Sequence, residues 1–415
     1  MIDLKAARAN PDAARAALGR KGAGEAFDRL LEADERWRAL VPRVDELRGR
    51  TKLSGKPTPE QREELQAVKA ELKDAEEALT TAEAERDALA LRVPNLPHDD
   101  VPDGSTENDV REVRRVGEPP ELEEPHEHLE LGRFDMERAA RMSGARFGYW
   151  IGDTARLALA LYRFALERLA AEGFETVLPP VLVREQALIG TGAFPTDEAN
   201  VYELPAEDLY LAGTAEIPLA SLHAGEILAP EELPLRYVAF SPCFRREAGA
   251  AGRDTRGMIR VHQFNKVEQF SLTRPDASWD ELELLLANTE ALVGALGLPY
   301  RVVVLPAGDM SSASAKTYDV EIWFPSQDRY RETASISNTT DFQSRRLGIR
   351  MRGESGPEPV HMLNGTAVVD RMALAVLENF LGDVPEVLHP YGAPARVERS
   401  PSIEGHPKGA TRSGG

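Results

Sequence analysis

The chain has 415 residues, 42% hydrophobic and 29% charged, which is enough for two to three domains with a buried core and excludes global disorder. A single cysteine, Cys243, excludes a disulfide framework and an all-cysteine metal site. The formal net charge of −19, from 69 acidic and 50 basic residues, argues by itself against nucleic-acid binding, because phosphate neutralisation needs clustered lysine and arginine.

Residues 60–92 have the pattern of a coiled-coil helix. Apolar side chains recur at alternating spacings of three and four from Leu65 to Val93, which makes an a/d seam broken only at Arg86. A seam of this kind needs a partner helix that covers it along its whole length.

The segment before it supplies a second, rougher apolar stripe, from Phe27 to Leu47. Pro42 lies inside this stripe and should kink or interrupt the helix, because proline removes one backbone hydrogen bond. Residues 52–59 carry the glycine and prolines of a chain reversal. We therefore predict an antiparallel coiled-coil arm over about 26–93, roughly 40–50 Å long. The alternative is a pair of helices that lie flat on the main domain.

Composition divides the chain into four parts. We expect an N-terminal domain over 1–97 that carries the arm, and a linker rich in proline and glutamate over 98–128. A compact domain follows over 129–392, and the Pro-, Ser- and Gly-rich residues 393–415 predict a disordered tail.

The compact domain has the pattern of an α+β fold. An amphipathic helix over 152–172 precedes a short strand that ends at Pro179-Pro180, and further helices are expected at 278–296 and 367–381. Most of the strands follow one another without intervening helices, which predicts an antiparallel sheet flanked by helices rather than a doubly wound fold. The expected strands are 235–247, 258–273, 300–305, 317–324 and 328–337.

Two of these strands form a hairpin with an unusual density of polar groups. Side chains two positions apart share a strand face, so Arg245 should point with Glu247, and Phe264 with Glu268. A guanidinium can bind a phosphate, and an aromatic ring can stack on a base. The alternative is an ordinary solvated hairpin with cross-strand ion pairs. In the same region, we expect Cys243 to be a small buried apolar residue. We expect His262 to have a structural role in the hairpin.

Phe244-Arg245-x-Glu247, with the return strand Arg260 to Phe264, resembles motif 2 of the class II aminoacyl-tRNA synthetases in its seryl-tRNA synthetase form. Four further segments in the correct order resemble other motifs of that family, and the resemblance covers residues 1–391. They are Gly173 to Pro180 (motif 1, at the homodimer interface of that class), Thr214-Ala215-Glu216 (the serine-binding loop), Tyr330 to Asn338 (the segment that contacts ATP and its metal) and Leu363 to Arg371 (motif 3).

The resemblance implies that serine and ATP form seryl-adenylate and pyrophosphate, and that the seryl group then moves to tRNA. Arg245 is expected at the α-phosphate and the serine carboxylate, and Arg371 at the γ-phosphate; these are the catalytic candidates. Phe264 should stack on adenine, with Glu247 and the Val261 backbone at its edge. The implied ATP-binding set is Arg245, Arg246, Glu247, Val261, Phe264, Glu332, Thr333, Ala334, Ser335 and Arg371.

Serine selection must come from hydrogen bonds, because serine is a small polar substrate. In the family's pattern, Thr214 and Glu216 bind the α-amino group of serine. Glu268 and two residues of motif 3 bind its hydroxyl group. The implied serine-binding set is Thr214, Ala215, Glu216, Arg245, Glu268, Asn364 and Thr366. In motif 3, Asp370 could either pair with Arg371 or orient it.

The resemblance also implies the cofactor and the partners. Glu332 and Ser335 are expected to hold Mg²⁺ together with ATP, and no structural zinc is expected, because the histidines and the cysteine lack suitable spacing. The expected partners are ATP, L-serine, tRNA(Ser) and a second copy of the chain, with tRNA(Sec) as a further candidate. No apolar run reaches ~18 residues and no signal peptide opens the chain, so we expect a cytoplasmic protein that does not enter membranes.

The acidic net charge does not exclude tRNA binding, because binding depends on a local surface. Basic residues outnumber acidic ones near the tip of the arm, and we expect this cluster to contact phosphates; the alternative is a solvated tip. Two other functions stay open: a specialised paralogue, for antibiotic resistance or for seryl-tRNA supply to secondary metabolism, and a non-enzymatic tRNA-binding homologue. The cluster consists of Arg43, Arg48, Arg50, Lys52 and Lys56.

Overall fold

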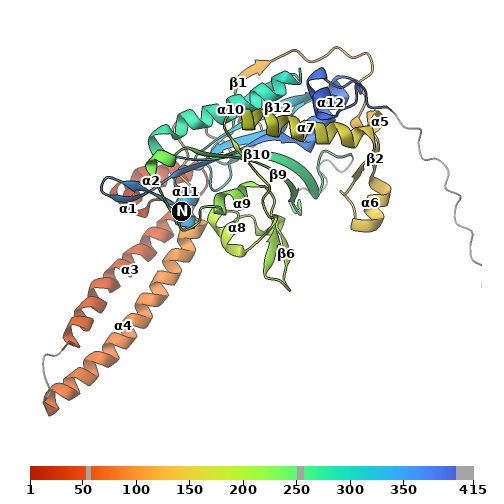
Figure 1. Ribbon diagram of the computed structural model, residues 1–415. Coiled ribbons are helices and arrows are strands. Elements are labelled where there is room, and N and C mark those ends of the chain that lie inside the picture. Colours follow the sequence, from red (N-terminus) through yellow and green to blue (C-terminus); the bar gives the residue numbers. More distant parts are fainter. Residues whose placement is uncertain (53–57, 250–256, 399–415) are drawn as a thin grey trace, which may run out of the picture.

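The N-terminal region forms a small helical base and a long arm. The computed structural model describes residues 1–52, 58–249 and 257–398. Helices α1 (Leu4–Ala9) and α2 (Pro11–Gly19) belong to the base, and α3 (Gly24–Arg50) and α4 (Pro59–Arg92) pack along each other. Figure 1 shows α3 and α4 projecting away from the rest of the molecule, so the predicted projecting arm is confirmed.

Helix α3 continues through Pro42, so of the two outcomes predicted there, a kink or an interruption, the interruption is wrong. Proline removes one helical hydrogen bond, but Val44 and Leu47 on the following turn are fully buried and hold the helix in place. The guanidinium of Arg86 lies over the ring of Trp37, 4.0 Å from its centroid. The break in the heptad seam is therefore filled by a cation–π contact between the two arm helices.

An eight-stranded sheet forms the centre of the main domain within the described residues. Strand β4 pairs with β9 in parallel, and the other neighbouring pairs in the sheet are antiparallel, which confirms the predicted α+β fold. In order across the sheet, the strands are β1 (Arg111–Val116), β11 (Tyr300–Val304), β12 (Lys316–Phe324), β13 (Arg329–Asn338), β16 (His361–Val369), β10 (Gln263–Thr273), β9 (Leu235–Phe244) and β4 (Glu175–Val177).

Three long helices, α7 (Asp153–Ala171), α10 (Ser278–Ala295) and α12 (Asp370–Asn379), cover one face of this sheet (Figure 1). Their apolar sides and the strands form the main hydrophobic core. Alternation along β10 sends Val267 into this core and Glu268 to the opposite face, so that face is free to carry a polar site.

Smaller elements lie around the sheet and its helices. The short helices are α5 (His128–Leu131), α6 (Met136–Ser143), α8 (Glu185–Thr191), α9 (Glu216–Ser221) and α11 (Phe342–Leu347), with single 3₁₀ turns at Glu198–Asn200, Pro230–Glu232, Pro275–Ala277, Pro325–Gln327 and Glu386–Tyr391. The short strands are β2 (Phe134–Asp135) with β3 (Tyr149–Trp150), β5 (Leu182–Val183) with β7 (Leu209–Leu211) and β6 (Tyr202–Leu204), and β8 (Ile227–Leu228) with β14 (Arg350–Gly353) and β15 (Gly356–Pro359).

Three expectations about element boundaries are corrected. The expected linker 98–128 contains β1, which joins the sheet at its edge. The helix expected over 367–381 begins only at Asp370, because the residues before it form strand β16. Of the tail, residues 393–398 pack back on the domain, since Val397 is buried and Arg396 pairs with Asp383; residues 399–415 lie outside the described residues.

No helix among the described residues is long and apolar enough to cross a membrane.

Candidate active site

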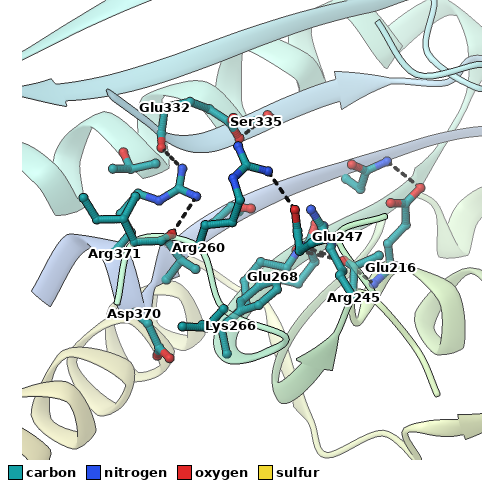
Figure 2. Close-up of a pocket in the computed structure, with 18 of the residues that line it drawn as sticks. Glu216, Arg245, Glu247, Arg260, Lys266, Glu268, Glu332, Ser335, Asp370 and Arg371 are labelled. Atoms are coloured by element: carbon teal, nitrogen blue, oxygen red, sulfur yellow. Dashed lines mark hydrogen bonds and ion pairs between the residues drawn. The ribbon is translucent and has the colours of Figure 1, made fainter. Parts of the chain in front are cut away.

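A pocket opens on the face of the sheet away from the three long helices, and Figure 2 shows the side chains that line it. Arg371 and Glu332 lie at one end, and Glu216 and Arg245 lie at the other. Most of the residues predicted from the sequence meet here, although they come from separate elements. These are Thr214, Glu216, Arg245, Glu247, Val261, Phe264, Glu268, Glu332, Thr333, Ser335, Asn364, Thr366 and Arg371.

Three predicted residues lie outside the pocket lining. Ala215 and Ala334 are buried in hydrophobic clusters, and the backbone N–H of Arg246 donates to the carbonyl of Asn200. Each is adjacent in sequence to a lining residue, so resemblance to a motif selects the segment correctly without resolving which side chains in it face the site.

Glu216 anchors the end of the pocket expected to bind serine. One of its oxygens, Oε1, accepts hydrogen bonds from Gln343 Nε2 at 2.7 Å and Asn364 Nδ2 at 3.0 Å. Burial, reinforced by the nearby carboxylate of Glu268, raises the pKa of Glu216. Two amides therefore fix a carboxylate that can accept from an amine or a hydroxyl.

Lys266 completes this end, and the sequence analysis missed it. Its ammonium forms an ion pair with Glu268 and donates to Thr214 Oγ1 at 2.6 Å. Thr366 lies directly across from Glu268 in the register of β16 with β10. Lys266 is two positions before Glu268 on the same strand face, so strand alternation could have found it.

Arg245 lies immediately after the end of β9 at Phe244. Its guanidinium donates to the carbonyl of Gly213 at 3.2 Å and lies 5.3 Å from the centroid of the Phe264 ring. Arg245 also exchanges backbone and side-chain hydrogen bonds with His262, whose Nδ1 lies 2.9 Å from the Arg245 carbonyl. The structural role predicted for His262 is confirmed, as is the burial predicted for Cys243.

Glu247 reaches the pocket by a different route from the one predicted. The strand has already ended, and Glu247 adopts a left-handed backbone with φ of +51°, so the two-residue alternation with Arg245 does not apply. Its carboxylate is held by Arg260, another residue missed from the sequence, at 2.7 Å. Phe264 and Glu268 do share one face of β10, as predicted.

Arg371 is at the start of α12, at the other end of the pocket. Its two terminal nitrogens donate to the carbonyl of Glu332 and, at 3.2 Å, to the carbonyl of Ile259. Arg245 and Arg371 thus come from opposite edges of one pocket, and the space between them contains the polar pair of Glu247 and Arg260 (Figure 2).

Asp370 is a buried residue of the pocket wall, and it accepts hydrogen bonds from the Tyr162 hydroxyl and, at 3.0 Å, from the Asn265 N–H. It therefore fixes the start of α12, which favours an orienting role for Asp370. Burial raises the pKa of its carboxyl group to about 6.

We expect this burial to make the stability depend on pH. The folded protein holds the Asp370 proton more tightly than the unfolded chain, whose pKa is near 3.8, so the stabilisation is present below pH 4 and is lost as the pH rises through 6. Relative to Asp370→Asn, the free energy of unfolding should fall by about 2 kcal/mol between pH 4 and 7. Urea denaturation of both proteins across this range checks it, and a flat or rising difference would contradict it.

The arm-tip cluster is only partly available for phosphates. Arg43 pairs with Glu46 and Glu71, and Arg48 pairs with Glu76 at 2.9 Å. The pairs with Glu71 and Glu76 join α3 to α4, and all three pairs compete with contacts to RNA. The two other described members of the cluster, Arg50 and Lys52, are exposed, and Lys56 lies outside the described residues.

No group of three or more His, Cys, Asp or Glu residues within 1–52, 58–249 and 257–398 is arranged to hold a metal ion. The pocket does have oxygen donors at the Arg371 end. Ser335 Oγ donates to Glu332 Oε1 at 3.4 Å, and Asp319, opposite Ser335 on the neighbouring strand, has a buried oxygen with no hydrogen-bond partner.

The polar face of this antiparallel sheet carries a pocket rich in carboxylates. One arginine reaches the pocket from the end of a strand and another from the final helix. This arrangement defines the core of a class II aminoacyl-tRNA synthetase. Comparison with known proteins agrees: a model of the class II core domain for G, H, P, S and T matches residues 201–380, and a model of the seryl-tRNA synthetase N-terminal domain matches residues 1–97.

Full-length relatives specify the family. The chain is 45% identical to the serine–tRNA ligase of Thermobifida fusca over 94% of this chain and 97% of that protein, and 44% identical to that of Mycolicibacterium vanbaalenii over 94% and 98%. Its structure resembles Pyrococcus horikoshii seryl-tRNA synthetase complexed with ATP, with a TM-score of 0.89 and 38% identity, covering 96% of this chain and 99% of the other. It also resembles the cytoplasmic serine–tRNA ligase of Naegleria fowleri in complex with AMP. The TM-score is 0.85 and the sequence identity is 32%, and the match covers 94% of this chain and 96% of the other. The chain belongs to the seryl-tRNA synthetase family.

Proposed function

We propose that this protein joins L-serine to ATP as seryl-adenylate, releases pyrophosphate, and transfers the seryl group to tRNA(Ser), with tRNA(Sec) as a second acceptor. The observation that carries the proposal is one pocket in which Glu216 and Arg245 lie at one end, with Glu268 and Lys266 among the lining residues, and Arg371 lies at the other end. An amino acid and a nucleotide can meet in such a pocket.

The chemistry requires attack by a serine carboxylate oxygen on the α-phosphorus and departure of pyrophosphate. Arg245 would bind the serine carboxylate and the α-phosphate together, and so would stabilise the charge that builds up in the transition state. Arg371 would hold the far end of the triphosphate, and Phe264 would support adenine. No general base is needed, because the attacking carboxylate is already ionised and the pocket supplies position and charge.

Magnesium fits the oxygen donors at the Arg371 end. Glu332 and Ser335 would hold it together with phosphate oxygens, and Asp319 provides a further carboxylate behind them. When bound, the ion would neutralise phosphate charge. We place the enzyme in the cytoplasm, where its tRNA substrates are used.

The arm should be needed for the second step only. Its base contributes Phe27, Leu30 and Ala90 to a core cluster, so we would remove only the distal residues 38–82 and join the helices by a short Gly-Ser turn. We expect unchanged serine-dependent ATP–pyrophosphate exchange and at least about a 100-fold loss in kcat/KM for tRNA charging, equivalent to ~2.7 kcal/mol. Charging assays with tRNA(Ser) and tRNA(Sec) measure this. Wild-type charging by the shortened protein would contradict the role proposed for the arm in binding tRNA.

We also propose a homodimer formed through the β4 edge of the sheet. Leu178, just after β4, is 79% exposed, and Leu159 on the adjacent α7 is 63% exposed, so this edge presents apolar surface. Leu178→Arg should shift the sedimentation mass from two chains to one, whereas Val113→Arg at the opposite edge should not. A wild-type mass of one chain would contradict the dimer.

Two other functions are separable from this one. A non-enzymatic tRNA-binding homologue would show no serine-dependent exchange at all. A specialised paralogue would catalyse the same exchange and would differ from a second copy in the same cell in its sensitivity to seryl-adenylate mimics. The complete pocket favours an active enzyme over the non-enzymatic homologue.

A further inference from the structure

A buried histidine on α5 joins two segments that are far apart in the sequence. His128 and Glu378 are fully buried side chains, and His128 Nδ1 lies 2.8 Å from Glu378 Oε1. The other ring nitrogen, Nε2, accepts a hydrogen bond from the backbone N–H of Met258 at 3.1 Å. Since Nε2 accepts, Nδ1 carries the proton and donates it to Glu378, so the carboxylate fixes the tautomer of the ring.

Met258 belongs to the return segment, residues 257–261, which passes along the nucleotide end of the pocket. Four residues of this segment line the pocket, namely Met258, Ile259, Arg260 and Val261. Helix α12 contacts the same stretch of chain again through Arg371, which donates to the Ile259 carbonyl at 3.2 Å. The helix that carries Arg371 therefore holds the return segment at two points, one direct and one through His128.

The fit of the histidine against the backbone is close. A Cβ added to Gly257 would lie 2.6 Å from His128 Nε2, and Gly257 has a positive φ of +76°, which side-chain-bearing residues rarely adopt. The other oxygen of Glu378 is occupied by Ser326, whose hydroxyl donates to it at 2.7 Å. Glu378 is thus held from its other side, and the imidazole ring cannot turn without breaking a buried hydrogen bond.

We infer that His128 is a positioning residue for adenylation. It fixes the position of the return segment relative to Arg371, and so fixes the shape of the nucleotide end of the pocket. The inference rests on the proposed function, because the nucleotide is the ligand that this end would bind. It concerns ATP rather than serine, since the serine end is built from Glu216, Glu268 and Lys266 on other elements.

The test compares His128→Phe, which keeps a ring but lacks the acceptor, with Gly257→Ala, which disturbs the same contact from the backbone side. KM and kcat are measured by ATP–pyrophosphate exchange with ATP and serine varied separately, and ATP binding is measured by calorimetry. We expect KM and Kd for ATP to rise about tenfold or more in both variants, with KM for serine within about twofold of wild type. Amide hydrogen exchange in the peptide containing Met258 should become faster.

Matched controls separate positioning from general stability. Ser326→Ala removes a hydrogen bond from the other oxygen of Glu378, and His126→Ala removes a partly exposed histidine two positions from His128. Both variants should keep the wild-type KM for ATP. Glu378→Gln retains an acceptor for Nδ1 and should restore most of the ATP affinity that a Glu378→Ala change loses.

If His128→Phe and Gly257→Ala keep wild-type ATP affinity and lose only thermal stability, as Ser326→Ala does, the positioning role is wrong. If one variant does not fold, the other decides. Absence of serine-dependent exchange in the wild-type protein would instead defeat the proposed function, and calorimetry with ATP would still decide the role of His128.

Discussion

We expect Arg245→Ala to lower kcat/KM for serine-dependent ATP–pyrophosphate exchange by at least ~10³-fold, a loss of ~4 kcal/mol in transition-state stabilisation. The guanidinium lies at the Glu216 end of the pocket. In the proposed mechanism it binds both the serine carboxylate and the α-phosphate, so one substitution removes a cation from both groups. Initial rates of pyrophosphate exchange measure the effect.

The fold should tolerate this change, which makes the loss interpretable. Arg245 is exposed, and within the described residues its side chain donates a hydrogen bond to the Gly213 carbonyl and contacts the Phe264 ring. Arg246→Ala is the matched control, because Arg246 is the next residue, is also exposed and does not line the pocket. We expect near wild-type exchange from Arg246→Ala. Equal losses from both variants would show that the site has been assigned wrongly.

The second large effect is expected for Arg371→Ala, which should lower kcat/KM for ATP by roughly 10²–10³-fold, or ~3–4 kcal/mol. Most of the loss should appear with ATP as the varied substrate, because Arg371 lies at the end of the pocket away from Glu216. Steady-state exchange with each substrate varied in turn measures the division between KM and kcat.

Part of that loss is structural, because Arg371 also donates to the carbonyls of Glu332 and Ile259. Arg371→Lys keeps the charge without the bidentate geometry and should recover a fraction of the activity. Arg329→Ala removes an exposed arginine from β13, the strand that carries Glu332, and should have little effect on kcat/KM for ATP. The assignment fails if Arg371→Ala raises KM for serine while leaving KM for ATP unchanged.

Patterns that repeat over many residues predict this fold well. The heptad seam from Leu65 to Val93 predicts the arm, and the run of strands without helices between them predicts the antiparallel sheet. Strand β1 escapes prediction because all six of its residues are exposed and four are charged, so no apolar alternation marks it. It is held by backbone pairing with β11 and by ion pairs such as Arg114 with Glu290.

The site is predicted best where a strand sets the direction of a side chain. Phe264 and Glu268 face the pocket because alternation continues along β10, and Lys266 between them follows the same rule. The rule fails at Glu247, because the chain leaves the strand at Phe244 and turns through a left-handed backbone. Pairings between distant segments, such as Glu247 with Arg260 and His128 with Glu378, depend on tertiary packing that no local pattern contains.

The most direct test of the whole account is ATP–pyrophosphate exchange by the purified protein with each of the twenty amino acids in turn. The paired carboxylates, the buried lysine and the two amides at the Glu216 end predict exchange that depends on serine, with alanine rejected by ~10⁴-fold or more because it leaves these groups unpaired. Exchange with another amino acid at a rate comparable to serine, or no exchange with serine at all, would contradict the account.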